Sequence, residues 1–307
     1  MKLTGRLTVL LLAFPVMVAA DRPTGLSIIR ADYESARYAT QTAHFKIYHD
    51  CVLDRDCLDF NRFEQTHDAI GGYFARLGLS LRTVNRDSKM RIRIFDDWNT
   101  REKEISAVGL RINMRAAIFD SKQNCVFFVA KFPGPSGDPG LQEAYLRTVL
   151  QHEATHQVLT NLGVVSFGVI YPFWISEGLA CLFEVPLPCC DDDRIPVNEL
   201  RLADVGSPEE LPRIKFLVSE IGTWEGKAAH SPKEYAQAWA LAHFLMHRRR
   251  DEMRTFLQKI MAVEPDEGDV HYGAMDEFEA VFGPADNKLD KEWRDYVADL
   301  LAQSKQP

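Results

Sequence analysis

Alternating apolar and polar positions predict that the first half of the chain mixes strands with helices. Between residues 59 and 77 the apolar positions fall on one helix face, and Gly78 follows as a stop signal. Shorter stretches of period two, or of continuous apolar residues, indicate strands on both sides of this helix. Strands are expected at residues 42–48 and 90–95, and a β-hairpin at 116–120 and 125–130 around Ser121–Asn124.

The pattern changes after a Pro- and Gly-rich loop at residues 133–140. Nearly all later segments have helical periodicity, except a second loop between Pro186 and Pro196. Helices are expected at residues 141–162, 176–183, 208–221, 232–247, 251–261, 275–282 and 289–301. The sequence therefore predicts an α+β protein with an N-terminal α/β subdomain (residues 21–135) and a helical subdomain (residues 136–307).

The first twenty residues have the pattern of a secretory signal peptide. Lys2 and Arg6 precede an apolar run from Leu7 to Val18, and Ala19 and Ala20 offer a small-residue cleavage site. The run is short for a membrane span, which makes an uncleaved anchor the weaker alternative. We expect a secreted or periplasmic protein with no membrane association after signal removal.

Composition and charge narrow the possible partners. The chain has 307 residues, 46% hydrophobic and 26% charged, which suits a globular protein with a sizeable core. Its net charge is −8, and removal of residues 1–20 leaves 34 of the 36 basic residues against 44 acidic ones, a net charge of −10. Binding to nucleic acid or to an anionic membrane is not expected at this charge. The oligomeric state stays open.

Six cysteines follow the signal segment: Cys51, Cys57, Cys125, Cys181, Cys189 and Cys190. An even number in an exported chain favours disulfides, and Cys51–Cys57 closes the shortest reasonable loop. The Cys189–Cys190 doublet could be reduced, or each cysteine could bridge elsewhere. The spacing does not match a thiolate metal site.

The strongest chemical signal is His152-Glu153-Ala154-Thr155-His156, an HExxH motif within a predicted helix. Positions four apart lie one above the other on a helix, so His152 and His156 can hold one Zn²⁺ ion. Glu153 lies about 100° round the helix from His152, where it can reach a metal-bound water without being a ligand.

A third ligand is needed, and Glu177 is the candidate. It lies near the start of the next predicted helix, twenty-one positions after His156 and within Trp174–Ala180. Gly178 and Ala180 are small, which would let this helix pack close to the metal helix. The alternative is a glutamate that only interacts favourably with the helix dipole.

An HExxH motif followed by a glutamate in W-x-x-E-G-x-A resembles the gluzincin metallopeptidases, the group of thermolysin, and most of all their small peptidase-MA-like members. The motif region covers about residues 146–183, and Tyr235–Leu241 is similar to the helix that follows in such domains. The resemblance implies a zincin-like fold, a zinc site at a cleft, and an edge strand of the 116–130 hairpin lining that cleft.

The resemblance also assigns roles and shows a departure. Zinc would activate water and polarise a carbonyl, and Glu153 would act as general base. Tyr235 would stabilise the oxyanion, with His230 and His271 as rivals; the alternative is that Tyr235 is a core residue with its hydroxyl at the surface. The thermolysin type has an aspartate four positions after the ligand glutamate, and Cys181 stands there instead. Another group must then orient the zinc histidine.

The sequence therefore predicts a zinc metallopeptidase that acts on a peptide or protein outside the cytoplasm. Two other functions remain open: a zinc hydrolase of another amide or ester, and a catalytically silent binding protein with the same fold. The intact Glu153 argues against the silent protein, because a scaffold needs no base beside two ligands. Endo- or exopeptidase specificity is not determined.

Overall fold

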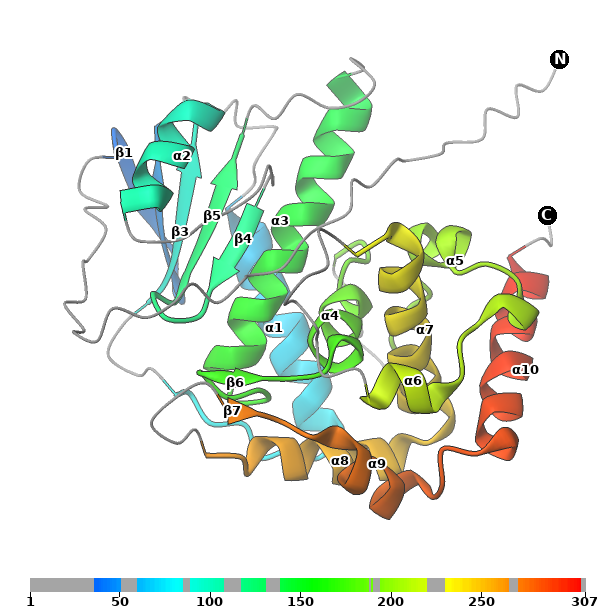
Figure 1. Cartoon of the computed structure of the whole chain (residues 1–307). Helices are drawn as coiled ribbons and strands as arrows, with labels where there is room; N and C mark the ends of the chain where they lie inside the picture. Colours follow the sequence, from blue (N-terminus) through cyan, green and yellow to red (C-terminus); the bar gives the residue numbers. More distant parts are fainter. Residues whose placement is uncertain are drawn as a thin grey trace, which may run out of the picture.

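The protein is described by a computed structural model. The described residues are 36–50, 60–84, 89–107, 117–130, 139–187, 189, 194–219, 230–264 and 270–304. They form an α+β structure in which a mixed sheet lies beside a large group of helices, which confirms the predicted class (Figure 1). The predicted signal peptide, the Cys51–Cys57 pair and Cys190 lie outside the described residues.

The sheet has five strands in the order β1-β2-β3-β5-β4. Its centre is parallel, with β3 (Met90–Phe95) between β2 (Phe45–His49) and β5 (Cys125–Val129). Both edges are antiparallel, β1 (Tyr38–Gln41) against β2 and β4 (Ala117–Asp120) against β5. The sequence did not predict β1, because all four of its residues are exposed and it has no buried alternation.

Helices cover both faces of the sheet. Along β5, Val126 faces the main core with α1 (Asn61–Arg76) and α3 (Pro139–Asn161), whereas Phe127 belongs to a smaller apolar cluster on the opposite face. The second face contacts α2 (Trp98–Ala107). This helix was not predicted either, since its largely polar sequence shows no clear apolar stripe.

The helical part is organised around two buried helices, α4 (Phe173–Leu182) and α7 (Pro232–Arg248). Around them lie α5 (Glu199–Asp204), a 3₁₀ turn (Pro208–Glu210), α6 (Ile214–Ser219), α8 (Arg250–Met261), α9 (Ala274–Phe282) and α10 (Asn287–Gln303), together with a two-stranded parallel sheet of β6 (Val169–Ile170) and β7 (Val270–His271). The helix predicted at 208–221 is wrong in its middle. Pro212 separates the 3₁₀ turn from α6, since proline has no N–H to donate and restricts the preceding residue.

Gly178 permits the close packing of α4 on α7. A Cβ atom at this position would lie 2.6 Å from the carbonyl oxygen of Ala238 and 3.2 Å from the Cβ of Ala242. The sequence expectation that Gly178 lets α4 approach the metal helix is therefore corrected, because this glycine faces α7 instead. The contact still fixes α4, and with it Glu177.

Helix α3 lies between the sheet and the helical part (Figure 1). One hydrophobic core joins Ile92 of the sheet, Val158 of α3, and Trp174 and Trp239 of the two buried helices, so it continues across the boundary expected near residue 135. Side chains near the middle of α3 consequently lie where both parts meet. Among the described helices, none has a stretch long and apolar enough to cross a membrane.

Candidate metal centre

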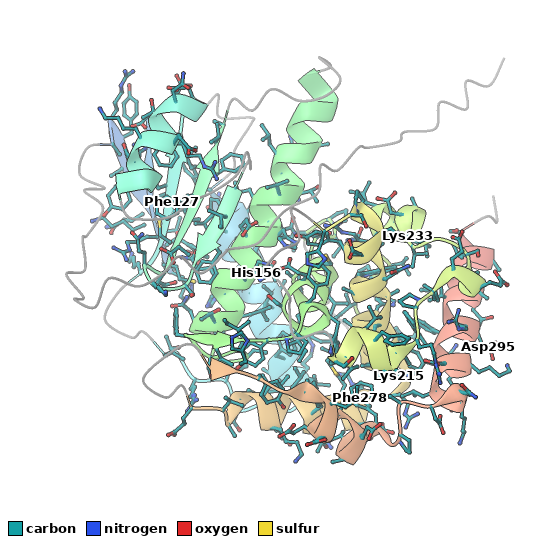
Figure 2. The ribbon with its side chains drawn as sticks, in the orientation of Figure 1. Phe127, His156, Lys215, Lys233, Phe278 and Asp295 are labelled. Carbon is teal, nitrogen blue, oxygen red and sulfur yellow. The ribbon has the colours of Figure 1, made fainter. Side chains whose placement is uncertain are left out.

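Helices α3 and α4 bring the three predicted metal ligands together. His152 Nε2 lies 3.0 Å from Glu177 Oε2 and 3.1 Å from His156 Nε2, and the His156 Nε2 to Glu177 Oε2 distance is 3.4 Å. All three side chains lie on the buried side of these helices, and His156 is labelled near the middle of α3 in Figure 2. Two nitrogens and one carboxylate oxygen thus face a common point.

The spacing of these atoms fits a tetrahedral zinc site. Ligands at 2.0–2.1 Å from zinc in a tetrahedron are about 3.3 Å apart. The three measured separations, 3.0, 3.1 and 3.4 Å, lie around that value. Two imidazoles with one carboxylate are also a usual protein ligand set for catalytic zinc.

The electrostatics of the cluster favour a bound cation. Burial alone would raise the pKa of Glu177, but His156 and His152 outweigh it and hold this pKa far below its usual range. Burial would likewise lower the pKa of His152, yet its hydrogen bonds with Cys181, Glu177 and Glu184 raise this pKa well above normal. The carboxylates therefore stay ionised and need positive charge beside them, which a proton or a metal ion can supply.

Glu184 orients His152 from the side opposite the cluster. Its Oε1 lies 2.7 Å from His152 Nδ1, and Arg201 Nε donates to its Oε2 at 2.7 Å. Asn198 Nδ2 donates to the same oxygen at 3.0 Å. Arg201 holds the pKa of Glu184 far below normal against the effect of burial. An ionised carboxylate can only accept, so Nδ1 carries the proton and Nε2 can present a lone pair to a metal.

Gln151, the residue before His152, fixes this arrangement. Its Nε2 donates to the carbonyl oxygens of Phe183 and of Val185, the second at 2.9 Å, so it binds the chain on both sides of Glu184. Its Oε1 accepts from Arg62 of α1 at 3.1 Å. These bonds tie α1, α3 and the segment after α4 together at the level of the metal cluster.

Cys181, which stands where the thermolysin type has an aspartate, does not orient His152. Burial raises the pKa of its thiol to about 11, so it stays protonated at neutral pH. The Cys181 thiol lies with His152 and Glu184 on the Nδ1 side of the imidazole, next to the Arg201 guanidinium. The positive charge of Arg201 would repel a metal ion from this second group. The orienting carboxylate is therefore Glu184. Sequence reasoning missed it, because α4 ends at Leu182 and no helical spacing then relates Glu184 to Glu177.

The turn of the β4–β5 hairpin is anchored to α3 by side-chain amides. Gln157 Nε2 donates to the carbonyl oxygen of Asn124 at 2.9 Å, and Asn161 Nδ2 donates to Asn124 Oδ1 at 2.8 Å. Asn124 has a φ of 47°, in the left-handed region that asparagine tolerates better than most residues. The predicted hairpin is confirmed, and these bonds fix the position of its turn relative to α3.

Glu153 contacts this hairpin. Its Oε2 accepts the backbone N–H of Phe119, on the edge strand β4, at 2.8 Å. The side chain is 8% exposed and takes no part in the group of three ligand atoms. Glu153 is therefore not among the three clustered atoms, and its role beside a metal ion stays a prediction.

The three candidates for an oxyanion donor differ in position. Tyr235 lies beside the cluster, with its ring 6.0 Å from the His152 ring in an edge-to-face contact and 5.1 Å from the Phe173 ring. The His230 ring stacks on the Phe173 ring, with 4.0 Å between the two ring centroids. His271 lies on β7 and is exposed. Tyr235 is buried, and its ring contacts one of the two candidate ligand histidines.

A second group of side chains with metal-binding atoms lies at the start of β2 and on α1. His44, His67 and Asp68 form it, and His44 Nδ1 also lies 2.6 Å from Glu64 Oε2. The two imidazoles are stacked at 3.7 Å with an angle of 19° between their planes. Their ring lone pairs therefore lie in nearly parallel planes instead of converging, which makes this group a poor site compared with the buried one.

Residues 146–267 match the sequence model of a family described as a protein of unknown function, DUF1570. The matched region contains His152, Glu153, His156, Glu177 and Tyr235, together with Glu184 and Arg201. No curated protein sequence matches the chain.

Proposed function

We propose that the protein is a zinc-dependent peptidase of the gluzincin type with a zincin-like fold. The observation that carries the proposal is the convergence of His152, His156 and Glu177 at tetrahedral spacing, next to an acid that is not a ligand. His152, His156 and Glu177 would hold Zn²⁺ and leave a fourth position for water, as catalytic zinc sites do.

Bound zinc would supply Lewis acidity, which lowers the pKa of a coordinated water and polarises the substrate carbonyl. Glu153 supplies the proton transfer. Its Oε2 is held by the Phe119 N–H, which leaves Oε1 to take a proton from water and to pass it to the leaving nitrogen. Glu184 keeps the proton of His152 on Nδ1 and so fixes the orientation of the ring.

The position of β4 supports a peptide as substrate over other amides or esters. It is an edge strand, since β5 is its one neighbour in the sheet formed by the described residues, and its Phe119 N–H is bonded to Glu153. A strand edge of this kind can pair with an extended peptide through main-chain hydrogen bonds. Tyr235, beside His152, is the proposed oxyanion donor.

The proposal also places this activity outside the cytoplasm. This location is inferred from the signal-like pattern of residues 1–20 and from the even number of cysteines after it. The Cys51–Cys57 disulfide is part of the same proposal, and mass mapping of the non-reduced exported protein tests it. Six reduced thiols would show that the inference about the compartment is wrong.

The deciding experiment compares zinc-loaded wild type with Glu153→Gln on a mixed peptide library. This change keeps the size of the side chain and removes the base, so cleavage should fall by about 10²- to 10⁴-fold while zinc content and Tm stay close to wild type. Glu264→Gln, at an exposed position, is the matched control and should cleave like wild type.

Each other outcome has a clear meaning. Cleavage by Glu153→Gln equal to wild type at full zinc loading would assign the activity to another site. Hydrolysis of amide or ester substrates without any peptide cleavage would favour the non-peptidase hydrolase. Zinc binding with no hydrolysis of either kind would favour the silent binding protein.

A further inference from the structure

A hollow lies at the end of the β4–β5 hairpin, next to the loop that precedes β6. Its volume is about 440 Å³. The walls combine apolar side chains, two cations and the polar turn of the hairpin. Its lining includes Val84, Arg91, Ser121, Lys122, Gln123 and Phe167.

The hollow is positively charged in a protein that is acidic overall. Arg91 and Lys122 both line it, and none of its described lining residues is an aspartate or a glutamate. Asp120 contacts the turn, where it is buried and accepts the backbone N–H of Lys122 at 3.0 Å. Arg91 donates to the carbonyl oxygen of Gln123, which holds its guanidinium over the turn. A guanidinium keeps its full charge when one of its five N–H groups goes to a neutral carbonyl. The whole chain has a net charge of −8, so this local excess of positive charge is not expected from composition.

The hollow lies at the end of β4, the edge strand along which a substrate peptide would lie. Phe119, whose N–H meets Glu153, is two residues before Ser121, where the lined turn begins. At about 3.3 Å per residue in a strand, the turn is roughly 7–10 Å from the base. A peptide paired with β4 would therefore bring into the hollow a side chain two or three residues from the bond to be cleaved.

We propose that this hollow, the Arg91–Lys122 pocket, binds an acidic side chain of the peptide substrate. The two cations would pair with the carboxylate, and Val84 and Phe167 would contact the aliphatic part of the same side chain. The inference rests on the proposed peptidase function and adds a substrate class to it. The rigid attachment of the turn to α3 through Asn124 keeps the pocket at a fixed distance from Glu153.

A positional peptide library tests the pocket through cleavage. Wild type should prefer Glu or Asp over Gln or Asn by about fivefold to tenfold in kcat/KM, at one position two or three residues from the scissile bond. Lys122→Met should weaken this preference, and Lys122→Glu should abolish or reverse it. Cleavage of a reference peptide without acidic residues should stay within about twofold of wild type, because Lys122 does not touch the proposed catalytic residues.

Lys215→Glu is the matched control, because it makes the same change of charge at an exposed position on α6, well separated from His156 in Figure 2. It should leave the preference unchanged. The proposal would be overturned if Lys122→Glu kept the full preference for acidic residues. It would also be overturned if Lys215→Glu changed this preference as much as Lys122→Glu does. A library with no acidic preference at these positions would overturn it as well.

A binding measurement separates failure of the pocket from failure of the peptidase function. The probes are two fluorescein-labelled hexapeptide pools, with Glu or Gln fixed at the third position, titrated into zinc-loaded Glu153→Gln. Tighter binding of the Glu pool, lost on adding Lys122→Glu, would support the pocket even if wild type cleaves nothing. Equal binding of both pools would overturn the pocket even if wild type cleaves peptides.

Discussion

Glu184 Oε1 lies 2.7 Å from His152 Nδ1, while Glu177 lies 3.0 Å from the Nε2 atom of the same ring. Glu184 therefore orients the imidazole from its Nδ1 side, and Glu177 lies at its Nε2 side among the candidate metal ligands. The ring cannot rotate without losing a buried hydrogen bond on each side, and this fixes the direction of the Nε2 lone pair.

The first prediction concerns this orienting contact. Glu184→Gln keeps the side-chain volume but removes the charge that fixes His152 and neutralises Arg201. Zinc affinity should fall by about 10- to 100-fold, measured by competition with a chelator. Glu210→Gln changes an exposed residue that pairs with Lys233 and caps the 3₁₀ turn at Ser207, and it should bind zinc like wild type. Unchanged zinc affinity in Glu184→Gln would show that the contact does not support the metal.

The second prediction concerns metal content. Elemental analysis of the purified protein should find about one zinc per chain, and His156→Ala should lose most of it, since one of three protein ligands is removed. His67→Ala, in the stacked surface group, should retain the metal. Stoichiometric zinc in a His152→Ala, His156→Ala double variant would refute the whole site.

The third prediction concerns Tyr235. Removing only its hydroxyl in Tyr235→Phe should lower kcat by about 10²-fold, the usual effect of losing one oxyanion donor, with zinc content unchanged. The contacts of the ring with His152 and Phe173 are kept in this variant. If kcat instead falls in His230→Gln and not in Tyr235→Phe, the donor is the histidine, and Tyr235 only packs against the ligand.

The fourth prediction concerns the contact of α4 with α7. Gly178→Ala places a methyl group 2.6 Å from the Ala238 carbonyl oxygen, so it should destabilise the protein by about 1–3 kcal/mol in urea unfolding. Gly71→Ala on α1 is the matched control. Its new Cβ would meet only Leu162 at 3.7 Å, and alanine should stabilise this helix by about 0.5–1 kcal/mol. Equal stability of the two variants would contradict the tight packing at Gly178.

The fifth prediction concerns acid stability. Burial, aided by the charge of His247, lowers the pKa of His243 to about 3, and its Nδ1 lies 2.7 Å from the Tyr296 hydroxyl. Between this value and the ordinary pKa of 6.5, the unfolded chain binds a proton that the folded protein does not, so stability must fall as pH decreases. The slope for one such group is about 1.4 kcal/mol per pH unit.

His243→Gln cannot bind this proton and should flatten the profile. With zinc at saturation, wild type should lose about 2 kcal/mol more than His243→Gln between pH 6.5 and pH 5, measured by urea unfolding at each pH. The range from pH 6.5 to pH 5 lies above the ordinary pKa of carboxyl groups, so the loss of stability in this range comes from histidines. Parallel profiles for the two proteins would show that His243 accepts a proton in the folded state.

Local sequence signals predicted the parts of the site that belong to one helix. The spacing of His152 and His156 is enough to place both on one face of α3, and Glu153 beside them, because helix geometry is the same in every context. The hairpin around residues 121–124 was likewise predicted from two apolar runs and a polar turn, and the structure confirms it. The missed strand β1 and helix α2 are segments whose local pattern carries little periodicity.

Contacts between distant segments were decided only by the tertiary structure. Nothing local pairs Glu153 with the N–H of Phe119, thirty-four residues earlier, or Glu184 with Arg201 behind the ligand histidine. Gly178 could be recognised as a close contact, but not as a contact with α7. The reason is physical: a helix repeats every 3.6 residues and fixes neighbours along one segment, whereas the sheet order and the packing of whole helices decide which segments meet.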